Sequence, residues 1–207
     1  MGQRGYRAER PRSYHTIEKI AQGLRSVIGL SPTDPLPGIA LFERLDEFRV
    51  VHNGRAIPLN YGVKALPHGV EAQAAYNRAE DRIDVILTPE TYQDLENDGY
   101  RARFSLPHEL GHVYLHTSEL LRLSHSPHAD AALKRGVRFD YPVYEDTEWQ
   151  ADVFAASMLM PGKALDALQR RRGALSEGAI QSVYGVSHRS AEIRLRVFEE
   201  RGSQIIV

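Results

Sequence analysis

The sequence predicts an α+β domain with a small, mostly antiparallel sheet, one helix that carries a sequence motif, and a helical C-terminal part. Three observations predict this fold class. Between residues 16 and 29, apolar residues recur at helical spacing. Between residues 50 and 87, the pattern changes to short runs with the alternation of strands. From residue 148 onward the pattern is helical again, and glycines separate its segments.

The composition is that of a globular domain. The chain has 207 residues, which fits one domain with a small appendage, and 42% hydrophobic residues can build a core. A net charge of −1 does not mark the whole chain as a nucleic-acid binder. The lack of cysteine excludes disulfides, thiolate metal ligands and a cysteine nucleophile. No secretory signal and no apolar run of bilayer length are recognisable, so we expect a cytoplasmic protein without a membrane partner.

The N-terminal part is expected to be helical after a polar start. Residues 1–15 are polar and rich in arginine, and we expect a disordered lead. The apolar positions of residues 16–29 predict an amphipathic helix that packs in the core. Residues 31–38 contain three prolines and a glycine, which predicts a linker. Residues 39–48 then form a short helix with one apolar side.

Short strands follow this helix. Residues 50–52 run into Asn53 and Gly54, the pair that favours a tight hairpin turn. Residues 70–76 and 82–87 have the composition of strands. In the second of these, apolar and charged residues alternate, which predicts one buried face.

Two helices follow the last strand. Thr88 as N-cap and Pro89 as first residue begin a short helix. The next helix is expected to begin at Ser105 as N-cap, with Pro107 in its first turn, where the missing N–H costs little. Gly111 inside a helix costs about 1 kcal/mol relative to alanine, so we expect another element to pack closely against it.

This second helix carries the pattern H-E-x-x-H at residues 108–112. Residues four apart lie on one face of a helix, so His108 and His112 can direct two imidazoles at one point. Glu109 lies further round the helix, where it can take a proton from a water bound at that point. The motif therefore predicts one Zn²⁺ per chain and a hydrolytic reaction with Glu109 as general base.

A catalytic zinc ion usually has three protein ligands, and Glu148 is the candidate for the third. Asp152 lies four residues later on the same helix face, where it would accept the second ring N–H of a ligating histidine. Both residues belong to an apolar helix over residues 148–160, and unpaired carboxylates would be costly there. His116 is an alternative ligand one turn beyond His112. Three histidines along one helix strain a tetrahedral site, so capping the helix end is the other role we consider.

Peptide hydrolysis also needs a donor to the tetrahedral oxyanion. The candidates for this donor or for substrate contacts are His125, His128, Tyr114 and Tyr144. The two histidines belong to residues 117–145, which we expect to be irregular. The sequence does not choose among the four candidates.

Two blocks of sequence match a known family. Residues 103–116 read R-F-S-L-P-H-E-L-G-H-V-Y-L-H, and residues 148–161 read E-W-Q-A-D-V-F-A-A-S-M-L-M-P. Together they resemble the ImmA/IrrE family of zinc metallopeptidases, and residues 184–195 resemble, more weakly, the helical segment that ends this domain. One departure is Pro107, where family members usually carry a small residue.

The resemblance implies a zincin-like metallopeptidase domain, which we expect over residues 16–165. By this resemblance His108, His112 and Glu148 are the zinc ligands and Glu109 is the general base. The resemblance also implies a protein substrate, and specifically a helix-turn-helix transcriptional repressor.

The C-terminal residues offer an alternative function. Residues 166–207 are expected to form a helical subdomain, in which residues 177–201 have the pattern of a helix-turn-helix. Its second helix contains Arg189, Arg194, Arg196 and Arg201, but glutamates offset their charge, so a packing role is favoured over DNA binding. The alternative is a non-catalytic regulator or a DNA- or protein-binding module with a structural zinc site.

Overall fold

The computed structural model describes residues 6–124 and 141–207. The helices are α1 (Tyr14–Val27), α2 (Gly38–Phe42), α3 (Pro89–Glu96), α4 (Tyr100–Leu115), α5 (Thr117–Leu123), α7 (Thr147–Leu159), α8 (Gly162–Arg172), α9 (Glu177–Tyr184) and α10 (His188–Ile205). Short 3-10 turns are η1 (Leu45–Glu47) and η2 (Val143–Glu145). The strands are β1 (Arg49–His52), β2 (Arg55–Val63), β3 (Ala72–Asn77) and β4 (Arg82–Leu87). The predicted α+β class is confirmed.

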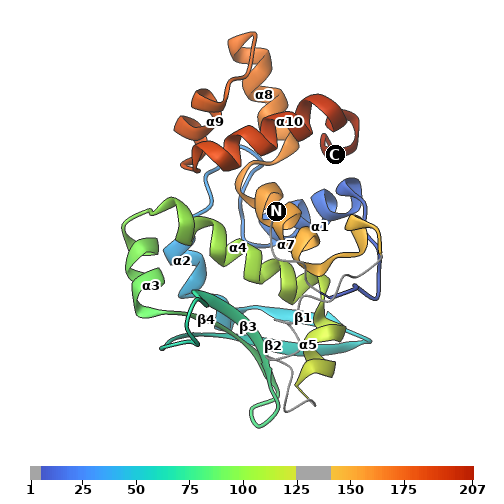
Figure 1. The fold of residues 1–207 in the computed structure, drawn as a ribbon, viewed down its shortest axis with the longest axis vertical. Coiled ribbons are helices and arrows are strands. Elements are labelled where there is room, and N and C mark those ends of the chain that lie inside the picture. The colour runs from blue at the N-terminus through green and yellow to red at the C-terminus, as the bar shows by residue number, and fades with distance from the viewer. Residues whose placement is uncertain (1–5, 125–140) are drawn as a thin grey trace.

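The elements form three layers (Figure 1). The sheet lies at the bottom of the view, α4 crosses above it, and α8, α9 and α10 lie at the top. Helix α7 packs along α4, and α1 packs against α7. Helix α4 is therefore enclosed between the sheet and α7.

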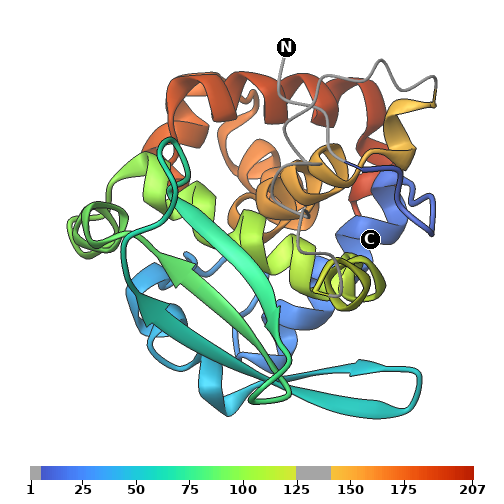
Figure 2. The same ribbon diagram turned by 60° about the horizontal axis from the view of Figure 1, so that its bottom comes forward.

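The sheet has the strand order β1-β2-β4-β3. The pairs β1–β2 and β3–β4 are antiparallel, and the central pair β2–β4 is parallel. The predicted turn is present, because Asn53 and Gly54 both have positive φ angles, 49° and 78°. Figure 2 shows the hairpin of β1 and β2 projecting from the rest of the sheet. The mostly antiparallel sheet is thus confirmed, with one parallel pair at its centre.

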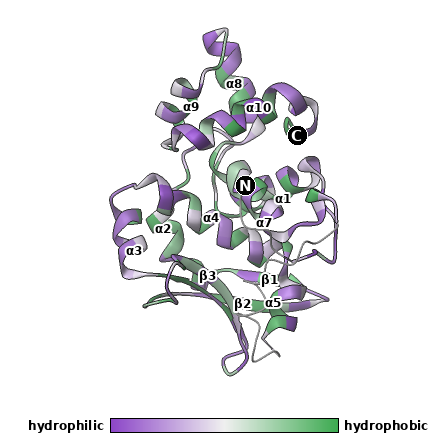
Figure 3. Ribbon diagram, viewed as in Figure 1, coloured by the Kyte–Doolittle hydropathy of each residue, from purple (hydrophilic) through white to green (hydrophobic). Residues whose placement is uncertain are grey.

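The buried face of the sheet follows the predicted alternation. Ile83, Val85 and Leu87 of β4 are fully buried. In Figure 3 hydrophobic colour runs along parts of the strands, whereas α3 and the outer turn of α8 are largely hydrophilic. From the other side, α4 contributes the buried residues Leu106 and Leu110 to the same core. The sheet therefore supports α4 through an apolar layer.

Helix α4 is longer than the sequence predicted. It begins at Tyr100, and Ser105 is an interior residue rather than the N-cap. A carboxylate oxygen of Asp94 in α3 accepts the backbone N–H of Ala102 at 3.2 Å, so a side chain from the preceding helix caps this end. Pro107 accordingly lies inside the helix, where it removes one backbone hydrogen bond, and its side chain is buried.

Another element packs closely against Gly111, as the cost of a glycine inside a helix predicted. A Cβ atom built on Gly111 would lie 2.9 Å from the Cα atom of Ala151 in α7. The absence of a side chain at residue 111 lets the two helices approach closely. This approach brings the first turn of α7 against the motif of α4.

The expectation of a disordered lead does not hold for residues 6–13. Arg7 forms an isolated β-bridge with Asp146, and Ala8 is buried. The backbone N–H of Tyr6 donates to Thr147 Oγ1 at 2.9 Å, and that of Glu9 donates to a carboxylate oxygen of Glu119 at 2.8 Å. This segment contacts the start of α7 and one residue of α5. Hydrophobic periodicity in the sequence does not predict such contacts.

The C-terminal part is helical, as predicted. Gly173 ends α8, and Gly185, in the left-handed conformation, ends α9. Gly178 does not interrupt the chain as expected, because it lies in the first turn of α9. The stretch expected to be irregular contains α5 in its described portion. Among the described helices, none is long and apolar enough to cross a membrane.

Candidate metal centre

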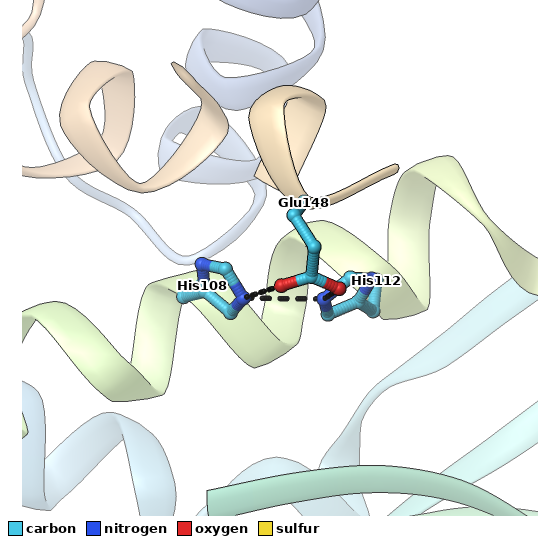
Figure 4. Close-up of side chains that lie close together, drawn as sticks. All are labelled: His108, His112 and Glu148. Atoms are coloured by element: carbon cyan, nitrogen blue, oxygen red, sulfur yellow. Dashed lines mark hydrogen bonds and ion pairs between the residues drawn. The ribbon is translucent and has the colours of Figure 1, made fainter. Parts of the chain in front are cut away.

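Two histidines of α4 and a glutamate of α7 meet at one point (Figure 4). The Nε2 atoms of His108 and His112 lie 3.2 Å apart. Glu148 Oε2 lies 3.3 Å from His108 Nε2, and Glu148 Oε1 lies 3.5 Å from His112 Nε2. We call His108, His112 and Glu148 the ligand cluster. In the described part of the chain, these are the residues whose ligand atoms come close enough together to hold a metal ion.

The spacing of these atoms fits a tetrahedral ion. Zinc bonds of about 2.0–2.1 Å place neighbouring ligand atoms roughly 3.3 Å apart in a tetrahedron. The two histidine Nε2 atoms lie 3.2 Å apart, close to this value, and two different oxygens of the Glu148 carboxylate lie 3.3 and 3.5 Å from them. Two imidazoles and one carboxylate are also a usual donor set for catalytic zinc, with a fourth position left for water. The residues therefore fit a zinc site in both chemistry and geometry.

The position of Glu148 is fixed by the start of α7. Asp146 is the N-cap of this helix, and its Oδ1 atom accepts the backbone N–H groups of Glu148 at 2.9 Å and Trp149 at 3.4 Å. Glu148 therefore lies in the first helical turn. The close contact between Gly111 and Ala151 then holds this turn above the motif.

Asp152 lies beside a histidine of the ligand cluster. Its Oδ1 atom lies 2.9 Å from His108 Nδ1, one turn of α7 beyond Glu148. A carboxylate can only accept here, so His108 carries a hydrogen on Nδ1 and directs Nε2 at the ligand cluster.

Residues 94–196 match the family model of Peptidase M78, described as the IrrE N-terminal-like domain. The chain belongs to this family. The matched residues include α4 and α7, and with them the whole ligand cluster and Glu109. A search of the curated proteins finds no match. Membership in this IrrE-like peptidase family, together with the ligand cluster, supports a function of the metallopeptidase type and a zinc site.

Burial and neighbouring charges act in opposite directions on the pKa values at this IrrE-like site. Burial lowers the pKa of His108, but hydrogen bonds to Asp152 and Glu148 outweigh burial and raise it to about 10. Burial raises the pKa of Glu148, but His108 and His112 outweigh it and hold this pKa below its usual range. A proton on His108 Nε2 faces the other two members of the cluster. A metal ion bound to the same three atoms would have to displace that proton.

Glu109 lies beside the ligand cluster but does not belong to it. Its Oε2 atom accepts the backbone N–H of Ala74 in β3 at 2.7 Å. Burial raises the pKa of this carboxyl above its usual range. Glu109 is therefore held between the motif helix and an edge strand of the sheet, in a setting that favours uptake of a proton.

Sequence reasoning missed the relation between His116 and Gln150. His116 is 1% exposed, and burial lowers its pKa to about 3. Its Nδ1 atom lies 3.1 Å from His112 Nδ1, and its Nε2 atom lies 3.1 Å from Gln150 Oε1. His116 is thus a neighbour of His112 and lies outside the ligand cluster. The signals were a histidine four residues after the motif and a glutamine within an apolar helix.

The other candidates have different surroundings. Tyr114 stacks on Phe154, with ring centroids 6.4 Å apart, and burial raises its pKa to about 12. Its ring thus takes part in packing between α4 and α7. Tyr144 lies in η2 and is 46% exposed. His125 and His128 lie outside the described residues.

Proposed function

We propose that this chain is a zinc-dependent endopeptidase with Glu109 as general base. The observation that carries the proposal is the ligand cluster, in which each Nε2 atom lies within 3.5 Å of a Glu148 carboxylate oxygen, with the partly buried Glu109 beside it. His108, His112 and Glu148 would hold the ion. Zinc bound there would lower the pKa of a coordinated water to about 7 and polarise the peptide carbonyl.

Glu109 moves the proton in this proposal. Its carboxylate takes a proton from the attacking water as the water oxygen bonds to the carbonyl carbon. The same carboxyl then gives that proton to the leaving amine nitrogen as the C–N bond breaks. The burial that raises the pKa of Glu109 favours the protonated form between the two transfers.

A protein substrate fits the surroundings of Glu109. Strand β3 is an edge of the sheet, and the N–H of Ala74 points away from β4 toward Glu109. An extended peptide can pair with such an edge through its main chain, which would carry a scissile bond past Glu109. We propose an extended segment of a protein as the substrate.

We propose a helix-turn-helix transcriptional repressor in the cytoplasm as the specific substrate. The support for this step is the resemblance of residues 103–116 and 148–161 to the ImmA/IrrE family. The experiment compares new protein N-termini across the host proteome when wild type or Glu109→Gln is expressed. A cut in one repressor that appears with wild type alone is the expected result. Equal cleavage by both proteins would rule out Glu109 as the base.

The same comparison tests the identity of the substrate separately from the mechanism of cleavage. If wild type cuts a different protein and Glu109→Gln does not, the endopeptidase proposal stands and the repressor proposal fails. If neither protein cuts anything while both bind zinc, the alternative of a non-catalytic binding module gains support.

The contacts of α10 weigh against DNA binding as that alternative. Three of the four arginines in this helix have partners within the chain: Arg189 pairs with Glu192, Arg194 with Glu18, and Arg201 lies over the ring of Tyr14. Arg194 is 2% exposed, so it cannot meet a phosphate without leaving the core. The packing role favoured by the charge balance of the sequence is thus supported over DNA readout.

A further inference from the structure

We infer that His116 and Gln150 are positioning residues that fix the tautomer of His112, so that its Nε2 atom faces the ligand cluster with a lone pair. This inference rests on the proposed zinc site and deepens it. The two residues form a chain of hydrogen bonds that runs from Gln150 through His116 to His112. Which atom donates in each bond follows from the groups that surround the amide of Gln150.

The orientation of the Gln150 amide determines which atoms donate along this chain of hydrogen bonds. One end of its amide lies 2.8 Å from the carbonyl oxygen of Tyr144 and 3.2 Å from that of Arg10. Carbonyl oxygens only accept, so this end must be the NH₂ group. The other end lies 3.2 Å from the guanidinium of Arg12, which only donates, and so must be the oxygen. Gln150 therefore has one permitted orientation.

This orientation determines the protonation of His116. Gln150 Oε1 lies 3.1 Å from His116 Nε2, and an amide oxygen can only accept. The hydrogen of the neutral imidazole must therefore be on Nε2, which leaves Nδ1 with a lone pair. Because the side chain of His116 is buried, bulk water offers no alternative acceptor for this hydrogen.

His116 in turn determines the protonation of His112. The two Nδ1 atoms lie 3.1 Å apart, and the one on His116 can only accept. His112 must then carry its hydrogen on Nδ1, so its Nε2 atom has a free lone pair. That atom is the one 3.2 Å from His108 Nε2 within the ligand cluster. Both histidines of the motif are thus oriented through Nδ1, His108 by Asp152 and His112 by His116.

The chain of hydrogen bonds ends in parts of the molecule far from the motif in sequence. Arg10 and Arg12 belong to the N-terminal segment, and Tyr144 belongs to η2 just before α7. The backbone N–H of Arg12 also donates to the carbonyl of Tyr144 at 3.4 Å, so the two segments contact each other. The N-terminal segment therefore helps to hold one zinc ligand.

The first test reads the tautomers directly. Long-range ¹H–¹⁵N correlation spectra of the full-length protein without zinc distinguish imidazoles protonated on Nδ1 from those protonated on Nε2. We expect His112 to be protonated on Nδ1 and His116 on Nε2. The opposite tautomer at either residue would overturn the inference. This result does not depend on catalysis or on zinc, so it is separable from failure of the proposed function.

The second test measures zinc affinity by competition with a chelator. His116→Phe keeps a ring but no acceptor, and we expect affinity to fall about tenfold to a hundredfold. His116→Gln is the matched control, because its amide can accept from His112 and donate to Gln150, and we expect about threefold loss at most. Thermal unfolding of the zinc-free variants separates this effect from loss of folded protein. Wild-type affinity in a folded His116→Phe would overturn the inference.

A second position keeps the test decisive if His116→Phe does not fold. Gln150→Met has a similar shape but no acceptor, whereas Gln150→Glu keeps the acceptor toward His116. Both variants lose the donor to Arg10 and Tyr144, so their difference reports the acceptor toward His116 together with the charge that the Glu carboxylate adds. We expect weaker zinc binding by the Met variant than by the Glu variant, and equal affinities would contradict the positioning role.

Discussion

At the scale of single residues, removing the charge of Glu148 tests whether this residue binds the metal ion or only supports a residue that does. Glu148→Gln keeps the shape of the side chain but removes the charge that balances the ion. We expect zinc affinity to fall by more than the roughly hundredfold limit typical of residues that only support a ligand. Asp152→Asn alters such a supporting residue, and we expect it to lower zinc affinity about tenfold to a hundredfold. Chelator competition measures both, and a smaller effect of Glu148→Gln than of Asp152→Asn would exclude Glu148 as a ligand.

Gly111 makes a second prediction at this scale. In Gly111→Ala the new Cβ would meet the backbone of Ala151 at 2.9 Å, so α4 and α7 must separate. We expect a loss of about 1–3 kcal/mol in the free energy of unfolding, as for other overpacked sites, together with weaker zinc binding.

Gly23 is the matched control for this substitution. It lies in α1, and a Cβ built there has no atom within 4 Å. Gly23→Ala should therefore stabilise the protein by up to about 1 kcal/mol and leave zinc binding unchanged. Urea unfolding measures both variants. A Gly111→Ala protein as stable as Gly23→Ala would show that the two helices are not in close contact.

At the scale of elements, the sequence predicts what depends on periodicity within one helix or strand. The ligand cluster and Asp152 follow from residues spaced by four, and the buried face of β4 follows from alternation. Strand β2 was not predicted, and it contains Pro58. This proline lies before Leu59, the first residue paired with β4, so its missing N–H costs no bond to that strand.

Features that depend on contact between distant segments were beyond sequence reasoning. The start of α4 is capped by Asp94 from another helix, so Ser105 was the wrong local signal. The link from Gln150 to His116 exists because α7 packs on α4, and no spacing along the chain encodes it. Local patterns thus identified the three side chains of the ligand cluster, and packing determines how they are oriented.

For the sheet, we predict that the charge of Asp84 stabilises the fold in a pH-dependent way. Its carboxylate accepts from Asn60 in β2, Asn77 in β3 and Arg82. Burial raises its pKa, but these hydrogen bonds outweigh burial and hold the pKa below the ordinary value of 3.8. A depressed pKa in the folded state stabilises the fold above the unfolded value, and this contribution is lost as pH falls through the folded value.

Asp84→Asn should therefore be less stable than wild type at neutral pH, by about 1 kcal/mol. The difference should shrink as pH falls below 3.8, because wild type then loses the same charge. Urea unfolding at a series of pH values measures the difference. A difference that stays constant down to the lowest pH would show that the charge of Asp84 does not stabilise the sheet.

At the scale of the whole molecule, a buried ion pair joins the two ends of the chain. Glu18 of α1 and Arg194 of α10 are 2.8 Å apart, and their side chains are 0% and 2% exposed. Glu18 also accepts from Ser157 Oγ in α7 and from the backbone N–H of Gly162 in α8. Four helices therefore meet at one carboxylate.

Arg194→Met should leave this carboxylate buried without its charge partner. We expect a loss of about 3–5 kcal/mol in the free energy of unfolding, and partial recovery in the double variant with Glu18→Gln. Trp149, the single tryptophan, lies in α7 and reports on that helix, while far-ultraviolet circular dichroism reports on all helices. The two signals should change together in wild type. Separate transitions would show that the C-terminal helices unfold independently.

The packing of α1 against α7 also has a consequence for biosynthesis. The apolar side of α1 is covered by a helix that begins 133 residues after its own first residue, from Tyr14 to Thr147. At about 5–20 residues per second, a ribosome needs roughly 7–27 s to make that interval. During this time the apolar side of α1 lacks this partner in the nascent chain, so a holding chaperone can bind there.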